Sequence, residues 1–308
     1  MTTSKKTGLH RFTLFTAGCT LLLLVAGALV TSNDAGLSVP DWPLSYGSLT
    51  PPMVGGIRYE HSHRLIASFV GLLTIVLAVW LWLREPRHWV RRLGLVALGA
   101  VIAQGVLGGL TVWFFLPVPI SVAHASLAQL FFSTVISLAL FTSRWWQSDL
   151  PHLDDSGAPH VHQLGLWSVA AIFLQLILGA ALRHKGFGIV PHLAGAAVVT
   201  FLVFWTAAVL RRRFPESAVL ARCRVLLHAL LGFQLLLGGA AWWSRVAARE
   251  FPQPMPVMVW LTVVHTVVGA LILAGAVVVA LVCFRILNPA KEAELASHSE
   301  AAPLRLSR

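Results

Sequence analysis

Eight long apolar runs, separated by polar segments, dominate the hydrophobic pattern of this 308-residue chain. A helix rises about 1.5 Å per residue, so about twenty apolar residues cross a bilayer core about 30 Å thick. We therefore predict an all-α integral membrane protein with eight transmembrane helices. The runs lie at 12–31, 63–83, 93–115, 119–142, 164–182, 190–210, 221–243 and 257–284.

The first run also has features of a cleaved signal peptide. It follows Lys5, Lys6 and Arg11 and ends in the small residues Ala26-Gly27-Ala28. Its apolar stretch is long for a signal core, however, and it supplies the first member of the repeat described below. We expect it to be retained as a helix.

The chain repeats a short motif in alternate runs. The sequences 104–109, 175–180 and 234–239 all fit Gln-x-x-Leu-Gly-small, and 25–28 keeps the end of the pattern. Each motif helix is followed by a loop and then by a helix with a histidine near its start. The repeating unit is therefore a helix pair used four times, which predicts two pseudo-symmetric four-helix bundles.

The repeat also predicts the domain boundaries. The two halves comprise 12–143 and 163–285, joined by a cytoplasmic linker at 144–162. Residues 1–11 form the N-terminal segment, and 286–308 form a tail that we expect to be disordered. The small residues of the motif have an ordinary explanation, because they allow helices to pack closely in lipid. A flat macrocycle between helices would need the same space.

Composition and charge fit a membrane protein. The chain is 57% apolar and 11% charged, with a mean hydropathy of +0.77 and a net charge of +11. Of its 23 Lys and Arg residues, 17 fall on the side of the N-terminus and 6 on the opposite side. The positive-inside rule predicts cytoplasmic termini in the cell (inner) membrane, although the acidic segment 144–162 adds little to that bias. The same bias accounts for the net charge without a nucleic-acid partner.

Four histidines, His63, His124, His192 and His265, occupy the same place in the four repeats. A single histidine near the end of a membrane helix is most often an interfacial or hydrogen-bonded residue. Four at one depth are candidates for function, and two neutral imidazoles in a bundle can bind the two faces of one heme. Zinc or copper needs three or four donors, and the three cysteines lie apart. Each half is therefore predicted to bind one heme.

Glu60 distinguishes the two halves. It lies three residues before His63, whereas Ile189 lies three residues before His192. A salt bridge with Arg58 or Arg64 is one explanation for Glu60. The other is a proton acceptor beside a heme, which would make the first half a reaction site. The long outer loop 32–62 is expected to form a lid over this site.

These residues carry a resemblance to a known family. Thr31-Ser32, then Gly-Leu-Ser-x-Pro-Asp-Trp-Pro at 36–43, Glu60-x-x-His63-Arg64, the Gln-x-x-Leu-Gly helices and the later histidines resemble heme A synthase. The resemblance covers essentially all eight helices. It implies oxidation of the C8 methyl of heme O to a formyl group, by successive hydroxylations and loss of water from the hydrated aldehyde.

The resemblance also implies roles for single residues. His192 and His265 would ligate a resident heme b, His63 and His124 would hold the substrate heme O, and Glu60 would be the catalytic carboxylate. Heme O synthase becomes a candidate partner, whereas the electron donor, the oxygen source and any homo-oligomer stay open. From their charge we also expect propionate partners or interfacial anchors among Arg64, Arg183, Lys185, Arg245 and Arg249.

Two positions depart from the family pattern. The first outer loop contains no cysteine pair, so a role assigned to that pair does not apply here. His61 stands where a tyrosine is expected, and a surface residue, a supporting hydrogen-bond donor and an alternative ligand all stay open. His228 lies outside the repeat, and we expect it to serve packing or hydrogen bonding.

Two other classes of protein compete with the enzyme. A diheme electron-transfer cytochrome would use the same four histidines, but it would not need Glu60 or the long loop in one half. A transporter needs polar or charged groups near the bilayer midplane. The mid-helix polar residues here are mainly Gln104, Gln175 and Gln234, which argues against a transporter.

Overall fold

The computed structural model describes residues 3–289 of the chain. Within that range, eight helices are long and apolar enough to cross a membrane, so the protein is an all-α, multi-pass membrane protein as predicted. Residues 290–308, most of the predicted tail, lie outside the described residues. The eight helices are α1 (Thr3–Ser32), α2 (Ile57–Arg84), α3 (His88–Trp113), α4 (Val118–Thr142), α6 (Val161–Arg183), α7 (Ile189–Arg213), α8 (Ala218–Ala247) and α9 (Pro256–Ile286).

The helices extend beyond the apolar runs, because a helix does not end where its side chains become polar. The largest difference that bears on function is at α2, which begins at Ile57, six residues before the apolar run. Glu60 and His61 therefore lie on the first turns of a helix. The loop predicted at 32–62 is correspondingly shorter and comprises residues 33–56.

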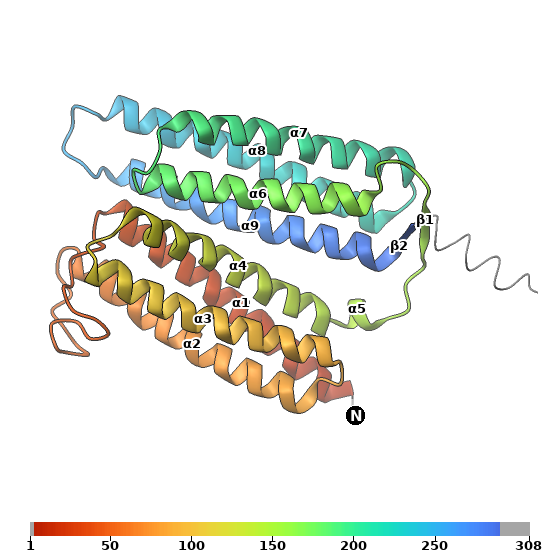
Figure 1. Ribbon diagram of the computed structural model, residues 1–308, viewed down its shortest axis with the longest axis horizontal. Helices are drawn as coiled ribbons and strands as arrows, with labels where there is room; N and C mark the ends of the chain where they lie inside the picture. The colour runs from red at the N-terminus through yellow and green to blue at the C-terminus, as the bar shows by residue number, and fades with distance from the viewer. Residues whose placement is uncertain (1–2, 290–308) are drawn as a thin grey trace, which may run out of the picture.

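The helices form two groups, α1 to α4 and α6 to α9, which Figure 1 shows as the lower and upper layers. Helix α9 lies between them and packs against both α1 and α4, while α4 also packs against α6. The long loop 33–56 lies at one end of the bundle, called here the loop end (Figure 1). Exact pseudo-symmetry of the halves stays a prediction.

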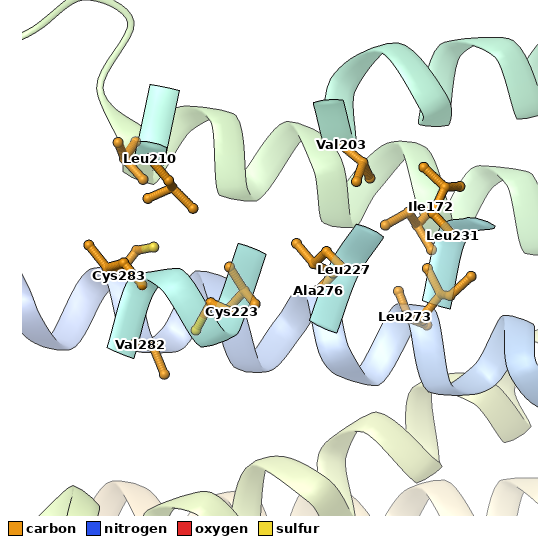
Figure 2. Packing of buried hydrophobic residues seen from close by; sticks show 14 of the residues in the cluster. Ile172, Val203, Leu210, Cys223, Leu227, Leu231, Leu273, Ala276, Val282 and Cys283 are labelled. Carbon is orange, nitrogen blue, oxygen red and sulfur yellow. The ribbon is translucent and has the colours of Figure 1, made fainter. Parts of the chain in front are cut away.

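Each half has its own apolar core. Figure 2 shows part of the second-half cluster, in which Leu210, Leu273 and Cys283 are almost fully buried. The first-half cluster includes Val70, Leu81 and Leu138 on α2 and α4. A third cluster, centred on Phe132, joins α4 to α9. Close packing of this kind fixes the helices that carry the histidines.

Three short elements were not predicted from the sequence. The linker between the halves contains α5 (Arg144–Gln147) and β1 (Leu153–Asp155), and β2 (Leu287–Pro289) directly follows α9. The two strands pair in parallel at the end opposite the loop end. Buried Asp155 accepts a 2.6 Å hydrogen bond from the Val161 backbone N–H and forms a 2.9 Å ion pair with Arg213. These contacts attach the linker to the second half.

Candidate functional site

Each of the four predicted histidines lies against a glycine on the preceding helix. A Cβ built on Gly27, Gly179 or Gly238 would come within 3.1 Å of Cε1 of His63, His192 or His265, respectively. At Gly108 the same contact, to Cε1 of His124, would be 3.5 Å. The four helix pairs therefore present the same edge of the imidazole to a glycine, and this repeated contact seats each ring.

The glutamine of the repeated motif supports the histidine backbone or ring. The side-chain amide of Gln104 donates to the carbonyl of His124 at 2.8 Å, and that of Gln175 donates to the carbonyl of His192 at 2.9 Å. The amide nitrogen of Gln234 lies 3.5 Å from Nε2 of His265. The corresponding position on α1, four residues before Gly27, is Leu23, so His63 has no glutamine support.

The second-half pair has the separation that one heme iron requires. The ring centres of His192 and His265 are 6.2 Å apart. Two metal–imidazole bonds of about 2.0 Å, with the metal between the rings, place the ring centres about 6 Å apart. Nδ1 of His265 is buried, and no described residue bonds to it. These residues fit two axial ligands of a heme.

The first-half pair is half-buried, and its two rings lie near each other. His63 and His124 are near enough to interact electrostatically. Nδ1 of each is buried without a hydrogen-bond partner among the described residues. Buried polar atoms of this kind usually have a partner, so the pair fits a site in which the imidazoles bind another group.

The contact between Gly238 and His265 can be tested by adding a methyl group at the glycine. Gly238→Ala should displace the His265 ring by a few tenths of an ångström, because the new methyl group would lie 3.1 Å from Cε1. Gly239→Ala is the matched control, since its Cβ would meet nothing within 4 Å. Weaker heme retention in the first variant than in the second, measured by heme absorbance per protein, is expected. Equal retention would contradict the seating role.

Glu60 is buried, and both of its carboxylate oxygens are bonded. Oε1 accepts a 2.6 Å hydrogen bond from Arg64, and Oε2 accepts a 2.8 Å bond from the backbone N–H of Val39. Arg64 also donates to the carbonyls of Asp41, Leu44 and Val39. The salt bridge considered for Glu60 is therefore formed with Arg64, and the pair anchors the loop to α2.

His61 adds a third anchor. It is buried, and its Nδ1 lies 2.8 Å from Oγ of Ser45 in the same loop. Of the three roles left open for His61, the surface position is wrong, because the loop covers it. We call Glu60, His61 and Arg64 the loop latch.

The loop also reaches the neighbouring helix. The indole of Trp42 packs edge-on against Trp113 and lies against Gly109, where an added Cβ would meet the indole at 3.0 Å. Gly109 adjoins Gly108, which contacts His124. The loop thus covers the end of α3 beside the first-half site, as a lid would.

The Asp41 carboxylate is held by backbone N–H groups of its own loop. Asp41 accepts hydrogen bonds from the backbone N–H groups of Gly47 at 2.7 Å and Tyr46 at 2.6 Å. These bonds, that of Gly47 foremost, hold the pKa of Asp41 below its ordinary value of 3.8. The carboxylate is therefore charged at neutral pH and keeps the turn closed.

The other basic residues at the loop end have different settings. Arg183 is partly buried, donates a 2.6 Å bond to the carbonyl of Thr31 on α1, and lies near Arg245. Lys185, Arg245 and Arg249 are exposed, and Arg249 pairs with Glu250 at 3.6 Å. Arg183 and Arg245 together thus bring positive charge to the loop end, beside the end of α1.

Two further histidines have their own environments. Burial, followed by the nearby charge of Arg183, holds the pKa of His184 below its ordinary value of 6.5, so its ring is neutral at neutral pH. His228 bonds through Nδ1 to the carbonyl of Arg224 on its own helix and packs edge-on against Phe204. The prediction that His228 serves packing and hydrogen bonding is confirmed.

Comparison with known proteins finds similar sequences over most of the chain. Residues 57–191 match a family model described as cytochrome oxidase assembly protein. The matched range contains His63 and His124. A heme A synthase of Shouchella clausii is 30% identical over 263 residues, which cover 76% of this chain and 85% of the relative. A heme A synthase of Symbiobacterium thermophilum is 27% identical over 249 residues, covering 71% of this chain and 80% of the relative.

Proposed function

Because the chain belongs to the heme A synthase family, an enzyme family of oxidoreductases, we propose that it converts the C8 methyl of heme O to a formyl group, giving heme A. The observation that carries the proposal is the repeated glycine–histidine contact in all four helix pairs. It is combined with a carboxylate, Glu60, one helical turn before His63, where the second half has Ile189 before His192. Four seated imidazoles supply axial ligands for two hemes. Glu60 marks the half in which the reaction takes place.

The first half is proposed as the substrate site, with His63 and His124 as ligands to heme O. Its two histidines are supported unequally, because Leu23 replaces the glutamine that would support His63. A less supported ligand suits a molecule that must arrive and leave. The lid residues around Trp42 exclude water from this side of the site, and Glu60 is the proposed proton acceptor.

The second half is proposed as the site of a resident heme b, held by His192 and His265. Such a heme supplies one-electron redox chemistry when it is bound. The 6.2 Å ring separation and the support from Gln175 and Gln234 fit permanent binding. Arg183 and Arg245 are proposed to pair with its propionates, because they bring positive charge to the loop end of this half.

The setting of the enzyme follows from the charge distribution. We propose that it lies in the cell (inner) membrane with the loop end outside and both termini in the cytoplasm, because the segments that the sequence assigns to the side of the N-terminus contain 17 of the 23 Lys and Arg residues. Heme O synthase is the proposed source of substrate.

The reaction is tested by expressing the chain with heme O present and analysing the extracted hemes. Wild type should yield hydroxylated or formyl heme, whereas Glu60→Ala should yield none while keeping heme b. The conservative variant Glu60→Gln keeps an acceptor for Val39 and tests the charge separately. Recovery of heme b alone from wild type, with no change in the Glu60 variants, would identify an electron-transfer cytochrome.

A further inference from the structure

Helix α4 carries a row of polar side chains on the face turned away from its own half. Ser126, Gln129, Ser133 and Ser137 follow one another at intervals of three and four residues, which places them on one side of a helix. The opposite side carries His124 and the first-half core residues Phe131, Val135 and Leu138. All four polar residues are nonetheless buried.

The second half covers this row. Helix α4 packs against α6 and α9 as well as against α1 and α3, and Figure 1 shows α4 at the boundary between the two groups. Phe132, next to Ser133, contacts Ala270 and Ala274 of α9. Because the row is buried on the side of α4 opposite the first-half core, and α4 packs against α6 and α9, we place the row in the interface between the halves.

Three of these side chains have polar atoms without protein partners. Among the described residues, Ser126 Oγ, Gln129 Oε1 and Ser133 Oγ have no hydrogen-bond partner. Hydroxyls in apolar surroundings usually bond to the carbonyl one turn back. Thr134 does so to Leu130 at 2.8 Å, and Ser137 does so to Ser133. These three side chains share one face of α4; Ser121, in the first turn of the helix and off this face, also has a buried hydroxyl without a partner among the described residues.

We propose that Ser126, Gln129 and Ser133 bind a file of water molecules between the two halves. Buried polar groups without protein partners are the usual sites of internal water, which needs two to four polar neighbours. From Ser126 to Ser133 the three side chains extend about 10 Å along the helix, about a third of the bilayer core. The upper end of the row lies at the level of His124, and the file does not rest on the proposed reaction.

X-ray footprinting tests this water file. Short pulses generate hydroxyl radicals from bound water, and mass spectrometry measures oxidation at each residue. The thiol introduced by Ser133→Cys should be oxidised several-fold faster than the thiol introduced by Thr134→Cys at the adjacent position, where the native hydroxyl bonds to its own helix. Native Cys283, fully buried in the apolar cluster, is the internal dry reference. A rate equal to that of Cys283 would overturn the proposal.

A second variant covers the case in which Ser133→Cys disturbs the interface. Adding Gln129→Leu to Ser133→Cys should slow the oxidation to the rate found for Thr134→Cys, because the file loses a central hydrogen-bonding group. Thermal unfolding gives an independent reading. In a dry interface, removal of an unpaired amide stabilises the protein, so a higher Tm for Gln129→Leu would contradict the water file.

Discussion

Replacing His265 with alanine is expected to abolish the b-type heme spectrum of the second half. The imidazole is one of two rings whose centres stand 6.2 Å apart, and the variant leaves His192 as a single ligand. No neighbouring histidine can replace it, since His228 is bonded to its own helix. The measurement is the reduced-minus-oxidised absorbance of the purified protein together with its heme content.

His228→Ala is the matched control for this loss, because it removes a histidine from the same half without touching the pair. His192→Ala should reproduce the loss, and His63→Ala should spare most of the heme b. Equal loss from all four histidine variants would contradict the division between a resident heme and a substrate heme.

Replacing Arg64 with alanine is expected to release the loop and destabilise the first half. The guanidinium donates to Glu60 and to three loop carbonyls, and its removal leaves a buried carboxylate without its charged partner. Removing one member of a buried ion pair typically costs about 3–5 kcal/mol. The measurements are thermal unfolding and limited proteolysis within residues 33–56.

Arg58→Ala is the control, because Arg58 lies on the same helix and interacts with Tyr59 at the exposed surface. It should change neither Tm nor cleavage. Arg64→Ala and Glu60→Gln together separate two roles of Glu60. If Glu60 only anchors the loop, activity in Arg64→Ala should decrease in proportion to the increase in loop cleavage. In that case Glu60→Gln should keep both the ordered loop and the activity.

The hydrophobic pattern predicted all eight membrane helices, because each run is long enough and apolar enough to span a bilayer. The pattern could not show what the motif residues do. Gly179 and Gln175 indicated helix packing and a mid-helix polar group, whereas the structure places the glycine under the His192 ring and the glutamine on its carbonyl. Such contacts depend on how neighbouring helices are rotated, and that rotation is set by packing.

The contacts of the loop latch could not be predicted from the sequence for a similar reason. The apolar run of the second helix begins at His63, so Glu60 and His61 were placed in a loop. Helix α2 in fact starts at Ile57, because its first turns are covered by residues 38–45 of the loop. Burial of polar residues by a distant segment leaves no periodic signal in the chain.

The loop latch has a thermodynamic consequence. Glu60, His61 and Arg64 lie within two turns of one helix and all bind the same loop, so the start of α2 and the loop behave as one cooperative unit. Substitutions in the three residues should therefore be strongly non-additive in a double-mutant cycle. Once one anchor is lost, the loop that the others hold is already displaced, and a second loss adds little.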